Sequence, residues 1–578
     1  MATNQSSPDA AQAVAECPKK RLFICCDGTW MDAVSTAAPL TNVARLARCV
    51  KAVSFEDSTQ ILQIVYYQTG IGRGTSRIGR AIDGATGRGI STNIRDAYSF
   101  LCHNFNKEKD EIYLVGFSRG AFTACCLARL IKDIGILTKP GLSHFPILFR
   151  SWKAAMHKKN SEENLQELSD LHSLVGDLEE AGFTSRSVKI KAIGIWDAVS
   201  ALGIPIPFQI PQPEDKSFHS VRTVIPDNVD YCYHALSLDE RRKHFRPVIW
   251  EPEPNFGALP SRSRLKQCWF VGEHGDVGGG NSGSTLLSDT SLIWMIAHLT
   301  TAGAEFDKKT LYNLLEPKKL LLQHAAQNPY QGSSSRASSA VAYQNGDDEG
   351  DNDGNEYEVD SPKLPRKRTG SYRIPQQQSH TITSTNTSTE EIRGKLSSQI
   401  PEKTKGKFIS ELSYTFMGTQ QRRPGRETSC RELVHWSVRL HLRGGHSSPA
   451  LKGWSMVRGV NTPHWIPIRN LLPYCLSALG EEEGFVVLDE EGTSGEEMKL
   501  VQDLLKFNKD SVGEQQTDQN NPRGGKFLQF FRENDEEIQR PRRLYVDPRV
   551  KTVVKEMDEF IKRHREGQLP PAPALGRD

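Results

Sequence analysis

The chain has 578 residues, 25% of them charged and 37% hydrophobic, and its formal net charge is +3 at pH 7. This near balance argues against a nucleic-acid-binding protein, and no apolar run reaches the length that spans a bilayer. Residues 1–20 are polar and lack the hydrophobic stretch of a secretory signal. The eleven cysteines fall mostly in apolar segments, so we expect reduced thiols and a cytoplasmic location.

Strand-like and helix-like segments alternate from residue 21 to about residue 300. The predicted strands are 22–26, 61–67, 112–115, 188–195, 231–236 and 267–271, and the predicted helices are 42–53, 90–105, 121–131 and 290–301. This alternation predicts an α/β fold with a mostly parallel central sheet and helices on both faces. Ligands bind such sheets beyond the carboxyl ends of the strands, so we expect functional residues just after strands.

One serine lies between two glycines where a predicted strand meets a predicted helix. Gly116, Ser118 and Gly120 form the pattern Gly-x-Ser-x-Gly, which is the nucleophile elbow of the α/β-hydrolases. The glycines allow strand and helix to approach closely, and the turn holds the serine in a strained, exposed conformation. Ser118 is therefore the predicted nucleophile. The alternative is a glycine-bounded strand–helix connection without chemistry.

A serine nucleophile needs a histidine base, and the base needs a carboxylate that fixes its tautomer. In this fold the partners follow in the order Ser, Asp or Glu, His. Asp197 follows the strand at 188–195, and His274 follows the strand at 267–271 on a glycine-rich loop. We expect these two residues to complete a triad with Ser118.

Alternatives to both partners remain open. The alternative interpretation of Asp197 is that its side chain caps the N-terminus of a helix that follows it. His234 is a second candidate base, although its place within a strand pattern is more typical of a buried structural histidine. Asp276, two residues after His274, is either the orienting acid or a cap of the glycine loop.

The tetrahedral intermediate of acyl transfer needs an oxyanion hole. We expect one donor to be the backbone N–H of Arg119, and the other to come from the loop Asp27, Gly28 and Thr29 after the first strand. The Arg119 side chain is placed either to attract an anionic head group or to brace the elbow by a salt bridge. This chemistry requires no metal and no cofactor.

Several segments, all in one order, resemble an uncharacterised α/β-hydrolase domain family related to the type VI secretion phospholipase effectors. The matching segments are 23–30, 41–43, 70–74, 116–121, 195–199, 234–241 and 274–280. The resemblance implies a Ser118–Asp197–His274 triad and hydrolysis of ester bonds. It also implies phospholipid among the substrates and a transient contact with a membrane surface.

The composition divides the chain into five predicted parts. These are a disordered N-terminus (1–20), the catalytic domain (21–326), a disordered low-complexity insertion (327–407), a C-terminal part that packs on the catalytic domain (408–510) and a charged, partly helical tail (511–578). The insertion is rich in Ser, Thr and Gln and carries acidic and basic runs, so it cannot bury enough apolar surface to fold.

The leading hypothesis is a cytoplasmic serine hydrolase that acts on carboxylic esters. One alternative is a non-catalytic interaction protein that retains the hydrolase fold. Another is a thioesterase or peptidase, because the same acyl-transfer machinery serves each of these substrates. Protein partners are not predicted.

Overall fold

The computed structural model describes residues 18–28, 39–70, 88–157, 162–199, 218, 221, 224–252, 265–281, 285–315, 420–424, 432–452, 454–458, 463–467, 488–510 and 525–539. The predicted insertion (327–407) lies outside these ranges. Most of the predicted N-terminal segment and of the tail lies outside them as well.

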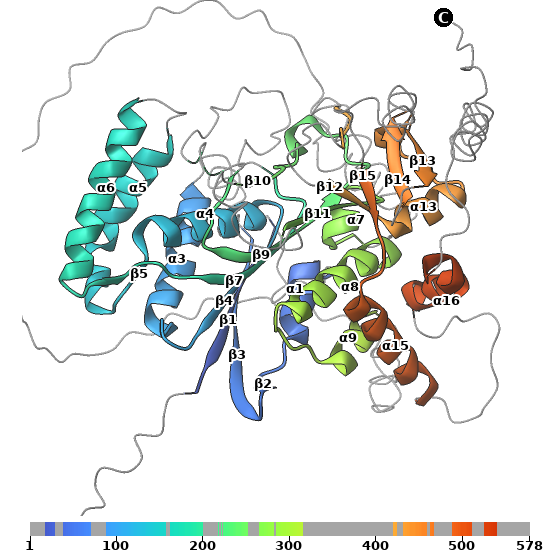
Figure 1. The fold of residues 1–578 in the computed structure, drawn as a ribbon, viewed down its shortest axis with the longest axis horizontal. Helices are drawn as coiled ribbons and strands as arrows, with labels where there is room; N and C mark the ends of the chain where they lie inside the picture. The colour runs from blue at the N-terminus through green and yellow to red at the C-terminus, as the bar shows by residue number, and fades with distance from the viewer. Residues whose placement is uncertain are drawn as a thin grey trace, which may run out of the picture. The chain divides into compact units, whose positions relative to one another are not determined.

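Within the described residues, eleven strands form one sheet in the order β13-β14-β15-β12-β11-β9-β7-β4-β1-β3-β2 (Figure 1). The strands are β1 (Lys20–Cys26), β2 (Val53–Glu56), β3 (Thr59–Gln68), β4 (Glu111–Phe117), β7 (Ile190–Trp196), β9 (Val229–Ser237), β11 (Leu265–Phe270), β12 (Glu432–His435), β13 (Trp454–Arg458), β14 (Pro463–Pro467) and β15 (Leu488–Glu491). The strands from β15 to β3 pair in parallel, and the antiparallel pairs lie at the two edges. The predicted α/β fold class is confirmed.

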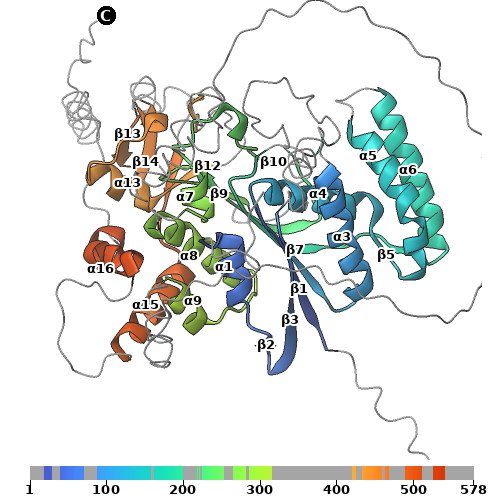
Figure 2. The same ribbon diagram turned by 180° about the vertical axis from the view of Figure 1, so that it is seen from behind.

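Helices cover both faces of this sheet (Figures 1 and 2). One face carries α3 (Arg88–Asn104) and α4 (Arg119–Ile134), with α5 (Phe145–His157) and α6 (Glu162–Glu180) packed against α4. The other face carries α1 (Asn42–Cys49), α8 (Thr285–Thr301), α9 (Lys308–Leu315), α15 (Gly495–Asp510) and α16 (Gly525–Gln539). Successive residues of a strand point to opposite faces of the sheet. In β1, Leu22 and Ile24 therefore pack in the core on the α3 and α4 face, and Phe23 and Cys25 pack in the core on the α1 and α8 face.

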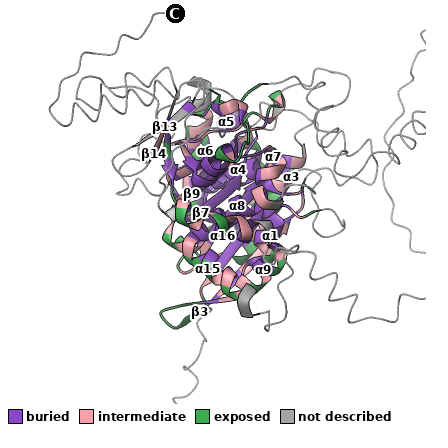
Figure 3. Cartoon of the chain, turned by 90° about the vertical axis from the view of Figure 1, so that its right-hand side faces the viewer, coloured by how far each residue is buried: buried purple, intermediate pink, exposed green. Residues whose placement is uncertain are grey.

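Smaller elements complete the described part of the chain. They are α7 (His274–Gly278), α13 (Trp436–Arg443), the 3-10 helices η2 (Pro140–His144), η4 (Lys243–Phe245) and η9 (Pro449–Leu451), and the strand pairs β5 (Ile136–Leu137) with β6 (Thr184–Ser185) and β8 (Val224–Ile225) with β10 (Glu251–Pro252). A third core joins α13 and β12 to β13 and β14. The central strands and the helix faces against them are buried (Figure 3).

Several details differ from the sequence predictions. His274, predicted on a glycine-rich loop, is the first residue of the short helix α7. The helix predicted over 42–53 ends at Cys49, because Val50 is extended and bridges to Phe306. Helices α5 and α6 were not among the predicted elements. No helix in the described ranges is both long enough and apolar enough to cross a membrane.

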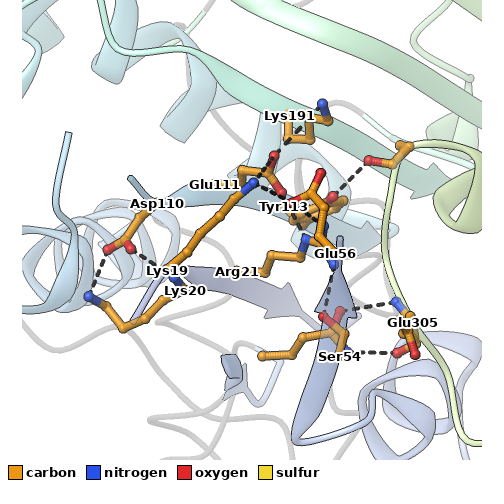
Figure 4. A network of polar contacts seen from close by, with 12 residues as sticks. Lys19, Lys20, Arg21, Ser54, Glu56, Asp110, Glu111, Tyr113, Lys191 and Glu305 are labelled. Carbon is orange, nitrogen blue, oxygen red and sulfur yellow. Dashed lines mark hydrogen bonds and ion pairs between the residues drawn. The ribbon is translucent and has the colours of Figure 1, made fainter. Parts of the chain in front are cut away.

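A charged network lies at the amino ends of β1 and β4 (Figure 4). Arg21 donates to Glu111 at 2.8 Å and to the Ser54 hydroxyl at 2.9 Å. Lys20 pairs with Asp110 at 2.8 Å. These contacts tie β1 to its neighbours at the edge opposite Ser118, which follows the carboxyl end of β4.

Candidate active site

Ser118 occupies the turn between β4 and α4. Its backbone has φ 58° and ψ −121°, a conformation that is strained for any residue with a Cβ. Its N–H donates to the carbonyl of Trp196 on β7 at 3.1 Å. The strand, the turn and the helix therefore place this serine at the carboxyl end of the sheet. The predicted strain is present, but the predicted exposure is wrong, because only 7% of the residue is exposed.

The two glycines of the elbow are required by close backbone contacts. A Cβ at Gly120 would lie 2.2 Å from the carbonyl oxygen of Cys26, and a Cβ at Gly116 would lie 2.6 Å from the Cα of Ala121. Real Cβ atoms do not approach backbone atoms this closely. Without a side chain at Gly120, the first turn of α4 can pack against the end of β1, and without one at Gly116, β4 can turn closely into α4.

Asp197 directly follows β7 and is fully buried. Its backbone also has a positive φ of 37°, and its N–H donates to the carbonyl of Ala235 at 2.7 Å. Ser237 donates to the carboxylate twice, from its N–H to Oδ1 at 3.1 Å and from its hydroxyl to Oδ2 at 2.9 Å. Strand β9 thus fixes the orientation of this carboxylate.

His274 is the first residue of α7, which follows β11. Its Nδ1 lies 2.6 Å from Oδ2 of Asp197. Facing a carboxylate oxygen, Nδ1 carries the hydrogen, which leaves Nε2 as the proton acceptor of the neutral ring. The ring packs between Phe117 and Phe245, with centroid distances of 4.7 and 4.8 Å. Since Phe117 immediately precedes Ser118, this contact joins the base to the nucleophile elbow.

Asp276, the alternative acid, makes different contacts. Its Oδ2 accepts the N–H of Glu273 at 2.9 Å, and its Oδ1 accepts from the side-chain amide of Asn281 at 3.0 Å. Glu273 and Asp276 form a capping box at the start of α7. Of the two carboxylates, Asp197 contacts His274, and Asp276 holds the helix that carries it.

His234, the alternative base, lies fully buried in β9. Its Nε2 accepts the N–H of Ala198 at 3.2 Å, and its ring packs on Trp250. Burial lowers the pKa of His234 to about 4, so the ring is neutral near pH 7. It supports the backbone immediately after Asp197.

Sequence reasoning missed two charged residues of the site, Arg422 and Glu240. Nη2 of Arg422 donates to Oδ2 of Asp197 at 2.9 Å, and Glu240 accepts the His274 N–H at 3.3 Å. Burial opposes ionisation of Asp197, but the Arg422 charge and the hydrogen bond from His274 outweigh it and lower the pKa of this carboxyl. Arg422 belongs to no motif, and 225 residues separate it from Asp197.

The predicted oxyanion loop lies beside the elbow. A Cβ at Gly28 would be 3.5 Å from the Cβ of Ser118. The Asp27 carboxylate accepts the Gly28 N–H at 2.7 Å, the Thr41 hydroxyl at 2.7 Å and the Tyr67 hydroxyl at 2.5 Å.

The other residues of the predicted oxyanion hole are Thr29 and Arg119. Thr29 lies outside the described residues. Desolvation lowers the pKa of the Arg119 guanidinium to about 10, so this side chain is still charged at neutral pH.

Comparisons with known proteins agree with the motifs. Residues 20–298 match the family model described as "T6SS, Phospholipase effector Tle1-like, catalytic domain", which confirms the resemblance over that segment. An uncharacterised protein of Saccharomyces cerevisiae, YEL023C, is 28% identical over 262 residues. The match covers 43% of this chain and 35% of the yeast protein, so this chain spans about a third of that relative.

Two solved structures are distantly similar. An uncharacterised protein from Pseudomonas aeruginosa has 18% identity and a TM-score of 0.28. The match covers 50% of this chain and 47% of the Pseudomonas chain. A structure titled "RedJ with PEG molecule bound in the active site" has 13% identity and a TM-score of 0.19. The match covers 50% of this chain and 94% of the chain in that structure. At these TM-scores neither likeness bears on the activity of this chain.

Proposed function

We propose, from the premise that residues 20–298 match the catalytic-domain family of Tle1-like phospholipase effectors, that this chain is a serine hydrolase of carboxylic esters. Phospholipid is the proposed substrate class. One observation carries the proposal: a serine at a strained strand–helix turn lies on the same sheet edge as the Asp197–His274 pair, whose nearest atoms are 2.6 Å apart.

The proposed reaction begins at Ser118 Oγ. As Oγ bonds to the ester carbonyl carbon, its proton passes to Nε2 of His274, and the Asp197 carboxylate stabilises the imidazolium that forms. His274 then gives the proton to the leaving alcohol. A water molecule repeats the sequence on the acyl-enzyme, releasing the acid and restoring Ser118.

The developing oxyanion needs fixed N–H donors. The first turn of α4 has N–H groups with no partner inside the helix. In the proposed complex, the positive end of the helix dipole lies toward the ester carbonyl. We assign one donor to the backbone of Arg119 and the second to the segment that contains Gly28 and Thr29. The Gly28 N–H donates to the Asp27 carboxylate in the present arrangement.

Phospholipid is favoured over other esters for two reasons. The matched family is one of phospholipase effectors, and the residue after the nucleophile, Arg119, carries a positive charge that suits a phosphodiester. A transient contact with a membrane surface follows from this substrate. The cytoplasmic location, expected from the sequence, stays a prediction.

The first experiment is labelling of the purified protein by a fluorophosphonate probe, which reacts only with an activated serine. We expect wild-type protein to be labelled, Ser118→Ala to be unlabelled, and His274→Ala to be labelled at least about 100-fold more slowly because the general base is lost. His103→Ala is the control, since this histidine is exposed on α3, and it should keep the wild-type labelling rate. His234→Ala tests the alternative base, and labelling lost in this variant but kept in His274→Ala would favour His234.

Each alternative has its own outcome. Absence of labelling in folded wild type would favour the non-catalytic interaction protein. Full labelling of Ser118→Ala would show that the nucleophile is wrong. If labelling depends on Ser118, initial rates on phosphatidylcholine vesicles, an acyl thioester and a peptide separate the phospholipase from the thioesterase and the peptidase.

A further inference from the structure

The proposed site takes in a residue from outside the matched catalytic domain. Residues 420–424 lie against the segment that follows β9, where the Gln420 N–H donates to the carbonyl of Arg241 at 2.7 Å. Nε of Arg422 donates to the carbonyl of Glu240 at 3.3 Å. These contacts place the Arg422 guanidinium beside Asp197, although the family match ends at residue 298.

The guanidinium is buried, and its charge is balanced at Asp197. Only 3% of the Arg422 side chain is exposed, and Nη2 lies 2.9 Å from Oδ2 of Asp197. Within the described residues, its buried Nη1 has no hydrogen-bond partner. A buried cation with an unfilled donor stabilises a fold poorly, since its desolvation is only partly offset. Stability alone therefore does not account for an arginine at this position.

The same carboxylate oxygen receives three donors. Oδ2 of Asp197 faces Nη2 of Arg422 at 2.9 Å, Nδ1 of His274 at 2.6 Å and the Ser237 hydroxyl at 2.9 Å. Arg422 thus fixes the oxygen that orients the histidine, and its charge favours the ionised carboxylate. We propose that Arg422 is a positioning residue of the hydrolase site, and that the site is complete only when residues 420–424 are docked beside Glu240. This inference rests on the proposed function.

The charge of Arg422 bears on the pH dependence of the reaction. The positive charge of Arg422 opposes addition of a proton to the Asp197–His274 couple, so without it the couple keeps a proton up to a higher pH. In the described part of the chain, the other charged or titratable groups near the couple include Glu240, Arg242, His234, Asp239, His446, Glu273 and Asp276. None of these is altered in the variants below.

The test measures kcat and KM for p-nitrophenyl butyrate across pH 5 to 9 with the full-length chain. For Arg422→Met we expect kcat to fall about 10- to 100-fold, KM to change less than about threefold, and the acidic limb of kcat/KM to move up by about one pH unit. Arg422→Lys keeps the charge and should retain the wild-type limb. The matched control is Arg439→Met, which removes a fully buried arginine that pairs with Glu490 and Glu537.

The outcomes separate the two proposals. If Ser118→Ala keeps the wild-type rate, the proposed function fails. If Ser118→Ala is inactive but Arg422→Met keeps the wild-type limb, or Arg439→Met moves the limb equally, only the inference about Arg422 is wrong. Arg422→Gln provides a second neutral variant should the methionine not fold. If neither neutral variant folds, Arg422 is a structural residue, and the inference is wrong as well.

Discussion

At the scale of single residues, the pKa of His234 differs between the folded and the unfolded chain, and measurements of stability can detect this difference. The ring is fully buried in β9 and accepts the Ala198 N–H through Nε2, so only the neutral form fits its surroundings. Burial lowers its pKa from the ordinary value of 6.5 to about 4 in the folded chain. In the unfolded chain the same ring takes up a proton near pH 6.5.

This difference sets the sign of the pH dependence. A histidine with a lowered folded pKa contributes its stability above about pH 6.5 and loses it as the pH falls toward about 4. We expect the free energy of unfolding to fall by on the order of 3 kcal/mol over that interval. In His234→Asn most of this fall should disappear, although His441, whose pKa burial also lowers to about 4, keeps part of it.

Urea unfolding at pH 7, 5.5 and 4.5 measures this effect. His103→Gln is the control, because His103 is exposed on α3, and it should reproduce the wild-type dependence. An unchanged dependence in His234→Asn would show that the buried ring is not the source.

At the scale of elements, the nucleophile elbow depends on contacts that a single methyl group would destroy. The Cβ of an alanine at position 120 would lie 2.2 Å from the carbonyl oxygen of Cys26, so strand and helix would have to move apart. We expect Gly120→Ala to lower the free energy of unfolding by about 3 kcal/mol and to abolish labelling of Ser118.

Gly176 in α6 provides the matched comparison. A Cβ there meets no atom within 4 Å, and glycine weakens a helix interior. Gly176→Ala should therefore raise the free energy of unfolding by about 0.5–1 kcal/mol. Chemical denaturation of both variants checks the pair, and equal effects of the same substitution would contradict the contact argument.

At the scale of the whole molecule, C-terminal strands belong to the same sheet as the matched domain. Strand β12 pairs with β11, and β15 pairs with β12. Glu491 at the end of β15 joins the C-terminal strands to the matched domain. Its carboxylate lies 2.6 Å from Lys266 Nζ on β11, 3.1 Å from His298 Nε2 on α8 and 3.0 Å from Trp294 Nε1 on α8. Burial opposes its ionisation, but the hydrogen bond and charge of His298, followed by the charge of Lys266, lower its pKa.

Removing this carboxylate should loosen the C-terminal strands. We expect Glu491→Ala to lower the free energy of unfolding by about 3–5 kcal/mol, because Lys266 and the ring nitrogens are left without their buried partner. Glu496→Gln, at an exposed pair with Lys499, should change it by less than about 0.5 kcal/mol. Thermal or urea unfolding compares the two, and a loss below about 1 kcal/mol in Glu491→Ala would contradict the role of this junction.

Local patterns were enough to predict much of the fold. The strands at β1, β3, β4, β7, β9 and β11 follow from short apolar runs, and the parallel sheet follows from their alternation with helices. The periodic leucines of α6 carried a comparable signal that the predictions did not use. Strands β12 and β15 are four residues each, and such short runs identify a strand only once a neighbouring strand is in place.

The elbow at Ser118 and the positions of Asp197 and His274 after strands could be predicted without the structure, because each depends on residues adjacent in the chain. The acid that faces His274 could be identified only in the folded chain, since Asp197 and Asp276 both lie in segments after strands and differ in what packs around them. The same holds for the contact of Arg422 with Asp197. Such a contact leaves no spacing or periodicity in the sequence, because it forms only when two distant segments are brought together by folding.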